Sequence, residues 1–184
     1  MTFKSRRPIL AAAISILLLL PFYAPALPGK RQTGPVQFSF RSIDGPLVTS
    51  ESLRGEVVVL AFGANWLPLS RKQVQGVRKL ADDYGKRGVA VFWVSTDSES
   101  SKSKNFASDD QLRAFSKKHS LQVTVLRDPD GQVSKQFGID QLPAIVILNK
   151  QGIAEGSPIG GLDPEGNLAD QLAPTLDRIL QEEE

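Results

Sequence analysis

The chain has 184 residues, 41% of them hydrophobic and 23% charged, which fits one soluble globular domain with a short additional segment. It contains no cysteine, so structural disulfides are excluded and the hydrophobic core has to hold the fold alone. The net charge of +2 comes from the first 26 residues, since removing their three basic residues leaves 19 Lys and Arg against 20 Asp and Glu; a neutral domain gives no support for a nucleic-acid partner.

Residues 1–26 have the three parts of a secretory signal peptide. A basic start is followed by an apolar run over residues 8–20 and by the small-x-small site Ala24-Pro25-Ala26. An uncleaved membrane anchor is the alternative, because the stretch of low polarity reaches Leu27 and approaches the ~20 residues that span a bilayer. In both cases the positive-inside bias predicts an extracytoplasmic domain, on the periplasmic or cell-surface side, that contacts the membrane only through this segment.

The remaining chain divides into a linker at 27–35, rich in Pro, Gly and polar residues, and a folded domain at 36–184. The domain opens with a short strand or hairpin, because residues 36–40 alternate weakly and Asp44-Gly45 is a turn pair. Apolar runs and periodicity then predict strands at 57–62, 89–94, 123–126, 144–148 and 153–159, and helices at 68–86, 111–118 and 168–179.

This order of elements predicts an α/β fold, a mixed sheet with helices on both faces. Residues 96–110 are rich in Ser, Lys and Asp, which predicts a solvated loop. A loop of this length is either functional or simply mobile, and we favour mobility. Pro174 interrupts the pattern of the last helix and predicts a kink or a restart there.

The phase of the first helix separates two positions near its start. Counting from Ser70, the residues at +4, +7, +11 and +14 are Val74, Val77, Ala81 and Tyr84, which share one helix face. Ser70 is therefore predicted to point into the core. Leu67, just before the helix, is predicted to lie exposed at its N-terminal tip.

The segment Phe62-Gly63-Ala64-Asn65-Trp66-Leu67-Pro68-Leu69-Ser70-Arg71 resembles the F-W-A-x-W-C-P-x-C-R segment of exported, TlpA-like thiol-disulfide oxidoreductases. These belong to the wider redoxin class that includes the AhpC/TSA family. Further similar segments follow in the expected order, over residues 91–95, 128–131, 137–143 and 145–152. The resemblance covers roughly residues 36–180 and implies a thioredoxin fold with an N-terminal extension, in which Pro143 is the cis-proline beside the active-site loop.

Two departures from this pattern exclude the chemistry of the family. Leu67 stands at the position of the nucleophilic cysteine and Ser70 at that of the resolving cysteine. A thiolate at a helix N-terminus attacks disulfides, and leucine cannot. No residue is therefore predicted to be catalytic. No cofactor or metal is predicted either. The acidic pairs are isolated from one another, and His119, the single histidine, is predicted to lie on the surface at the C-terminus of a helix.

Two functions from different classes remain. The first is a non-catalytic module that binds an extended peptide or protein segment at Trp66, Leu67, Pro68, Leu142 and Pro143, because exposed apolar patches tend to be interaction sites. The second is an enzyme that borrows a thiol from glutathione or a partner protein and depends on Ser70. The simplest alternative to both is that these residues only cap the core and that Ser70 bonds to the backbone.

Overall fold

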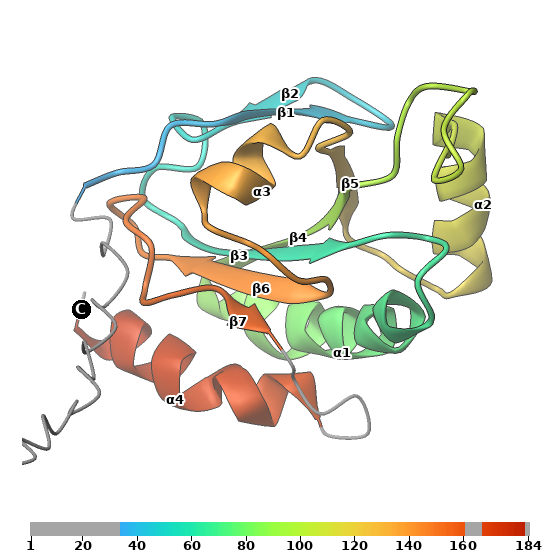
Figure 1. Ribbon diagram of the computed structural model, residues 1–184. Coiled ribbons are helices and arrows are strands. Elements are labelled where there is room, and N and C mark those ends of the chain that lie inside the picture. Colours follow the sequence, from blue (N-terminus) through green and yellow to red (C-terminus); the bar gives the residue numbers. More distant parts are fainter. Residues whose placement is uncertain (1–33, 161–166, 183–184) are drawn as a thin grey trace, which may run out of the picture.

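The computed structural model describes residues 34–160 and 167–182. These residues form a seven-stranded mixed sheet with helices on both faces (Figure 1), in the strand order β2-β1-β5-β4-β3-β6-β7. The strands are β1 (Ser39–Ser42), β2 (Leu47–Thr49), β3 (Val57–Gly63), β4 (Val89–Ser95), β5 (Thr124–Arg127), β6 (Ala144–Leu148) and β7 (Ile159–Gly160). The helices are α1 (Pro68–Tyr84), the 3-10 turn η1 (Gly85–Arg87), α2 (Asp109–Lys118), α3 (Gln132–Gln136) and α4 (Leu168–Gln181).

The centre of the sheet follows from strands that are apolar on both faces. All seven residues of β3 are buried, and the strand pairs in parallel with β4 and antiparallel with β6. Because side chains alternate along a strand, Val57, Val59 and Ala61 enter one hydrophobic core and the residues between them enter the other. The two faces of the sheet therefore pack against two separate hydrophobic cores.

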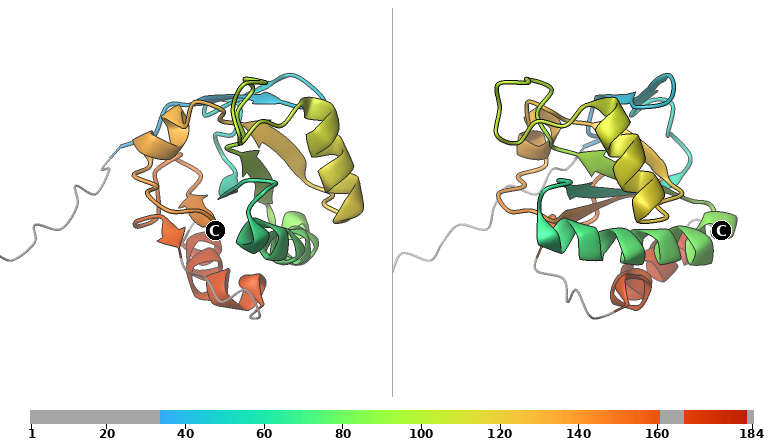
Figure 2. Two further views of the ribbon diagram at one scale, coloured as in Figure 1. Left: turned by 45° about the vertical axis from the view of Figure 1, so that its right-hand side comes forward. Right: turned by 90° about the vertical axis from the view of Figure 1, so that its right-hand side faces the viewer.

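Three helices cover one face of the sheet and a lighter layer covers the other. Figure 2 shows α1 and α4 side by side below the sheet, and the buried residues of α2 belong to the same core. The opposite core is closed by Val133 and Phe137 near α3 and by Val36 and Phe38 at the start of the domain. The close approach of α4 to α1 depends on Gly76, where a Cβ atom would lie 2.7 Å from the Cβ of Leu168.

The predicted fold class is confirmed, and the differences lie at the edges. β1 and β2 form the expected N-terminal hairpin. The strand predicted at 153–159 is instead a single bridge between Leu148 and Ala154 followed by the two-residue β7. Of the kink or restart predicted at Pro174, the restart does not occur, because α4 is one helix that includes this residue. Residues 1–33, which include the predicted signal peptide or anchor and most of the linker, lie outside the described residues.

No helix in residues 34–160 or 167–182 combines the length and the apolar character that a bilayer span requires.

Candidate functional site

The loop between β3 and α1 holds most of the predicted site. Pro68 occupies the first helical position, where its missing N–H costs nothing. Leu67 is the N-cap in an extended conformation, and no side chain caps the helix. Trp66 and Leu69 are 46% and 47% exposed and Pro68 is exposed. Leu67 is only half-buried rather than fully exposed, because it lies one residue outside the helix and beside its first turn.

The second predicted segment meets this loop across the sheet. The Leu142–Pro143 peptide bond is cis, as the resemblance implied. Phe62 pairs with Ala144 in the antiparallel register of β3 and β6, so Pro143 lies beside Gly63. From the second turn of α1, the Nε2 of Gln73 donates to the carbonyl oxygen of Ala144 at 3.4 Å.

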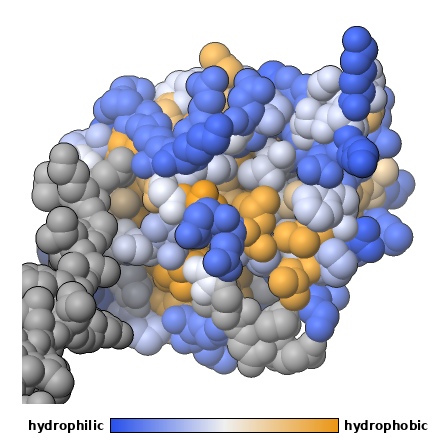
Figure 3. Space-filling view, viewed as in Figure 1, coloured by the Kyte–Doolittle hydropathy of each residue, from blue (hydrophilic) through white to orange (hydrophobic). Residues whose placement is uncertain are grey.

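Leu142 contributes less to an exposed patch than the sequence predicted. It is half-buried and packs against the core that contains Phe62. Leu69, which sequence reasoning did not select, takes its place among the exposed apolar residues, because helix phase puts it on the outer side of the first turn. Figure 3 shows hydrophobic side chains gathered in the middle of the face that carries β6 and β7, surrounded by hydrophilic ones.

A hollow lies next to the cis-proline. Its volume is about 340 Å³, and its lining comes from the residues that lead into β6, from the two residues before β7 and from β7 itself. The lining residues are Gly138, Ile139, Asp140, Gln141, Ala144, Ser157, Pro158 and Gly160. Ala144 lines the hollow, and its carbonyl oxygen accepts the hydrogen bond from Gln73 of α1. The hollow and the first turns of α1 therefore both adjoin the first residue of β6.

Ser70 lies in the first turn of α1, at the position where the resemblance implies a resolving cysteine. It is fully buried, as its helix phase predicted, and its Oγ accepts a hydrogen bond of 3.1 Å from the backbone N–H of Ala64. The hydroxyl therefore holds the loop to the helix from inside. A buried and bonded Oγ does not present a hydroxyl group to a thiol that arrives from solvent.

The packing around Ser70 leaves no room at Gly63, and we expect Gly63→Ala to lower the free energy of unfolding by about 1–3 kcal/mol. A Cβ atom at this position would lie 2.9 Å from the Oγ of Ser70 and 3.1 Å from the Nε1 of Trp93, both in the buried interior. Urea unfolding measures the loss. Gly45→Ala is the matched control because nothing lies within 4 Å of its Cβ; equal effects of the two substitutions would contradict the prediction.

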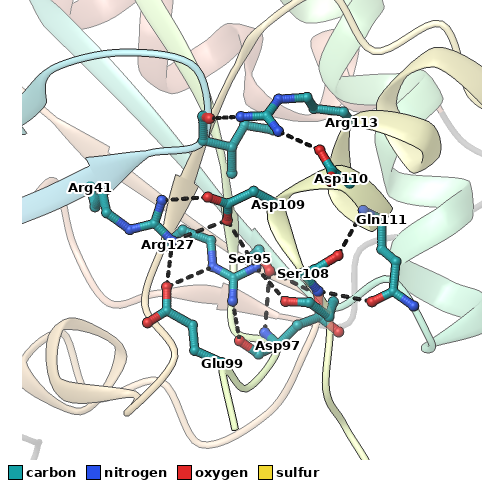
Figure 4. Close-up of polar contacts among 12 residues, drawn as sticks. Arg41, Ser95, Asp97, Glu99, Ser108, Asp109, Asp110, Gln111, Arg113 and Arg127 are labelled. Carbon is teal, nitrogen blue, oxygen red and sulfur yellow. Dashed lines mark hydrogen bonds and ion pairs between the residues drawn. The ribbon is translucent and has the colours of Figure 1, made fainter. Parts of the chain in front are cut away.

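A buried carboxylate behind the loop was not predicted from the sequence. Asp97 is fully buried just beyond β4. Its two oxygens accept hydrogen bonds from the N–H of Asn65 at 3.0 and 3.2 Å. One of them also accepts a bond of 2.8 Å from the Oγ of Ser95, and Figure 4 shows this pair. Burial raises the pKa of the Asp97 carboxyl, against the opposing effect of these bonds and of the charge of Arg127. Asp97 thus ties the following loop to the residue before Trp66.

Arg127 completes this network from β5. Its guanidinium is buried and donates to the carbonyl oxygens of Ala107 at 3.0 Å and Asp97 at 3.3 Å, and its Nε lies 3.5 Å from a carboxylate oxygen of Glu99. Asp109 lies next to the same guanidinium on the outside (Figure 4). The loop after β4 is therefore anchored at both ends, although it was predicted to be mobile. Asp97, a polar residue of this loop, is buried because it comes almost directly after the buried strand β4.

The other groups that could carry chemistry are dispersed. Within residues 34–160 and 167–182, no three His, Asp or Glu side chains are close enough together to hold a metal ion. His119 contacts the ring of Phe115, and its pKa is lowered by burial and by the charges of Lys118 and Arg71.

The sheet order, the cis-proline and the loop before α1 define a protein of the thioredoxin-like class, and the chain has no cysteine. The model of the AhpC/TSA family matches residues 33–156. The chain therefore belongs to the AhpC/TSA family.

Relatives of this chain come from both branches of redoxin chemistry. A chloroplastic peroxiredoxin Q of Triticum aestivum is 28% identical over 146 residues, 75% of this chain and 63% of the relative, so the chain spans less than two thirds of that protein. The thiol:disulfide interchange protein DsbE of Allochromatium vinosum is 23% identical over 97% of both chains. A putative protein disulfide isomerase from Bacteroides thetaiotaomicron has a similar structure, with a TM-score of 0.67, 19% identity and coverage of 83% and 91%.

Proposed function

We propose that this protein is a non-catalytic binding module that docks an extended peptide or protein segment where α1 begins. The observation that carries the proposal is the group of exposed apolar side chains at Trp66, Pro68 and Leu69 on a chain that has no cysteine. Apolar side chains of this size are expensive to leave in water, and their grouping on one surface is typical of interaction sites.

The geometry supports an extended partner rather than a compact one. The apolar loop, Pro143 and the 340 Å³ hollow follow one another across the end of β3 and the start of β6. An extended segment crossing this line would place alternate side chains on the loop and in the hollow.

A borrowed thiol has less support. That mechanism needs an accessible hydroxyl at Ser70, and this side chain is fully buried with its Oγ bonded to the backbone.

We further propose that the domain works outside the cytoplasm. The basic and apolar sequence of residues 1–26 supports this location. Among proteins of similar structure is a secreted disulfide oxidoreductase of Mycobacterium tuberculosis, with 21% identity and a TM-score of 0.58.

Affinity capture from extracytoplasmic extract tests the binding function. We expect the double variant Trp66→Ala, Leu67→Asp to lose at least one protein that the wild type captures reproducibly, because the substitutions remove apolar area and add a charge at the contact. Quantitative mass spectrometry of the two captured sets is the measurement.

The matched control is Leu47→Asp. Leu47 is 62% exposed on β2, at the edge of the sheet away from β6. The Leu47→Asp variant should capture the same proteins as the wild type. If the double variant and the wild type capture identical sets, the loop is not a docking surface and these residues only cap the core.

A further inference from the structure

Part of the lining of the hollow beside the cis-proline is apolar. Ala144, the first residue of β6, is buried, and Ile139 and Pro158 are half-buried. Ile139 also packs against the core that contains Phe62. With about 340 Å³, the hollow is near the small end of ligand pockets, which range from about 300 to 1,000 Å³. It therefore suits one long side chain of a partner better than a large ligand.

The rest of the lining is polar and carries a negative charge. Asp140, Gln141 and Ser157, here called the rim, are exposed. Among the described residues that line the hollow, Asp140 is the one with a charge. Within residues 34–160 and 167–182 its carboxylate makes no hydrogen bond and no ion pair. The fold thus leaves a carboxylate beside an apolar hollow, where a partner can neutralise it.

Gly160 keeps the hollow open on the side of β7. It pairs with Ala144 in the antiparallel register of β6 and β7, and residues that face each other in such a pair carry their side chains on one face of the sheet. Nothing lies within 4 Å of a Cβ atom at Gly160, and its φ is outside the left-handed region. A larger side chain at this position would therefore take up space in the hollow without straining the fold.

We propose that the hollow binds a basic side chain, Lys or Arg, of the extended segment that docks on the apolar loop. This inference rests on the proposed binding function and names the chemistry of one side chain of the partner. Lys and Arg combine an apolar stem, which can cover Ile139 and Pro158, with a charged end that reaches the rim. There the Asp140 carboxylate can accept a charge-assisted hydrogen bond, and the side-chain oxygens of Gln141 and Ser157 can accept others.

Four synthetic peptides test the charge preference of the hollow. Each is an amidated heptapeptide with fluorescein at its N-terminus, in which Ser alternates with Phe and the central residue, two positions from each Phe, is Lys, Arg, Gln or Glu. Alternate side chains of an extended chain share a face, so a Phe can contact the loop while the central side chain enters the hollow.

Fluorescence anisotropy with the purified full-length protein measures the Kd of each peptide. We expect the Lys and Arg peptides to bind about fivefold more tightly than the Gln peptide, and the Glu peptide to bind more weakly than all three. The advantage of the basic peptides should shrink as salt is added.

Charge variants locate this preference at one residue. Asp140→Asn should make the Lys and Gln peptides bind equally, and Asp140→Lys should make the Glu peptide the tightest of the four. Because Asp140 is exposed, neither substitution is expected to affect folding. The matched control Asp130→Asn removes the same charge from an exposed turn residue that does not line the hollow, and it should keep the preference of the wild type.

A variant with a filled hollow tests whether the central side chain enters it. Gly160→Val should weaken binding of the Lys peptide by about tenfold, because the added methyl groups compete with the bound side chain for the same space. Gly45→Val is the matched control. Gly45 precedes β2 at the other edge of the sheet, nothing lies within 4 Å of its Cβ, and the substitution should change nothing.

Every result supports or overturns the basic side chain. Equal binding of the four peptides, a preference for Glu, a preference for Lys that survives Asp140→Asn, or binding that Gly160→Val leaves unchanged overturns it and leaves the binding function standing. If no peptide binds, the inference fails as well. The capture experiment then decides separately about the proposed function, since different captured sets support that function and identical sets overturn it too.

Discussion

Replacing Asp97 with alanine is expected to lower the free energy of unfolding by about 2–3 kcal/mol, since the substitution strands buried donors. The N–H of Asn65 and the Oγ of Ser95 both donate to the Asp97 carboxylate in the interior. The loop before Trp66 should loosen at the same time. Urea unfolding measures the first effect, and quenching of Trp66 fluorescence by iodide in a Trp93→Phe background measures the second.

Asp97→Asn is the matched control for this prediction. It keeps an oxygen that can accept from Asn65 and removes the charge, so it should lose less stability than Asp97→Ala and leave Trp66 quenching close to that of wild type. An alanine variant as stable as wild type, or equally strong quenching in all three proteins, would show that Asp97 does not hold the loop.

A comparison of the wild type with Asp97→Asn also tests how the stability of the fold depends on pH. Burial raises the pKa of Asp97 in the folded state, so the folded protein binds this proton more tightly than the unfolded chain does. Ionisation of Asp97 therefore costs stability as the pH rises from about 4, the ordinary pKa of an aspartate. The free energy of unfolding of wild type minus that of Asp97→Asn should fall from that pH upward, by no more than about 1.4 kcal/mol per pH unit, and level off above the folded pKa. Arg127, Glu99 and Asp109 surround the site and are common to both proteins. A difference that rises with pH would have the wrong sign.

Substituting both Leu67→Cys and Ser70→Cys is expected to create thiol-disulfide exchange where the wild type has none. Leu67 is the N-cap of α1 and Ser70 lies one turn further on, so the two positions are neighbours. A thiol at the half-buried N-cap is reachable from solvent, and the helix N-terminus lowers its pKa. Insulin reduction in the presence of dithiothreitol is the measurement, and the wild type without cysteine should not exceed the background.

The single variant Leu67→Cys controls for the second thiol, because it has a nucleophile without a resolving partner. It should form mixed disulfides and reduce insulin more slowly than the double variant. A folded double variant that forms no internal disulfide would mean that the site has changed beyond the loss of its two sulfur atoms.

Local patterns predicted most of the sheet and the inward direction of Ser70. The apolar run at 57–62 indicated a strand buried on both faces, and β3 is buried throughout. The helical phase that placed Ser70 inward also holds, because position along a helix fixes direction without reference to distant residues. Leu142 lies outside regular periodicity, where exposure depends on what packs nearby, and it is half-buried. Leu69 is exposed on the outer side of the first turn of α1, a position that helix phase could have identified. The segment after β4 is largely exposed, as its Ser, Lys and Asp content indicated, but its sequence gave no sign that Arg127 of β5 would bond to Asp97 and Ala107 within it.

Composition alone, without any coordinates, was enough to exclude disulfides and dithiol chemistry, because a chain without cysteine has no thiolate wherever it folds. Periodicity was enough for the α/β order, because strand and helix spacings are local. Only the tertiary structure decided that Asp97 bonds to Asn65 over 32 residues and that Pro143 lies beside Gly63. Those relations depend on strand register and helix packing, which bring together residues whose spacing in the chain carries no signal.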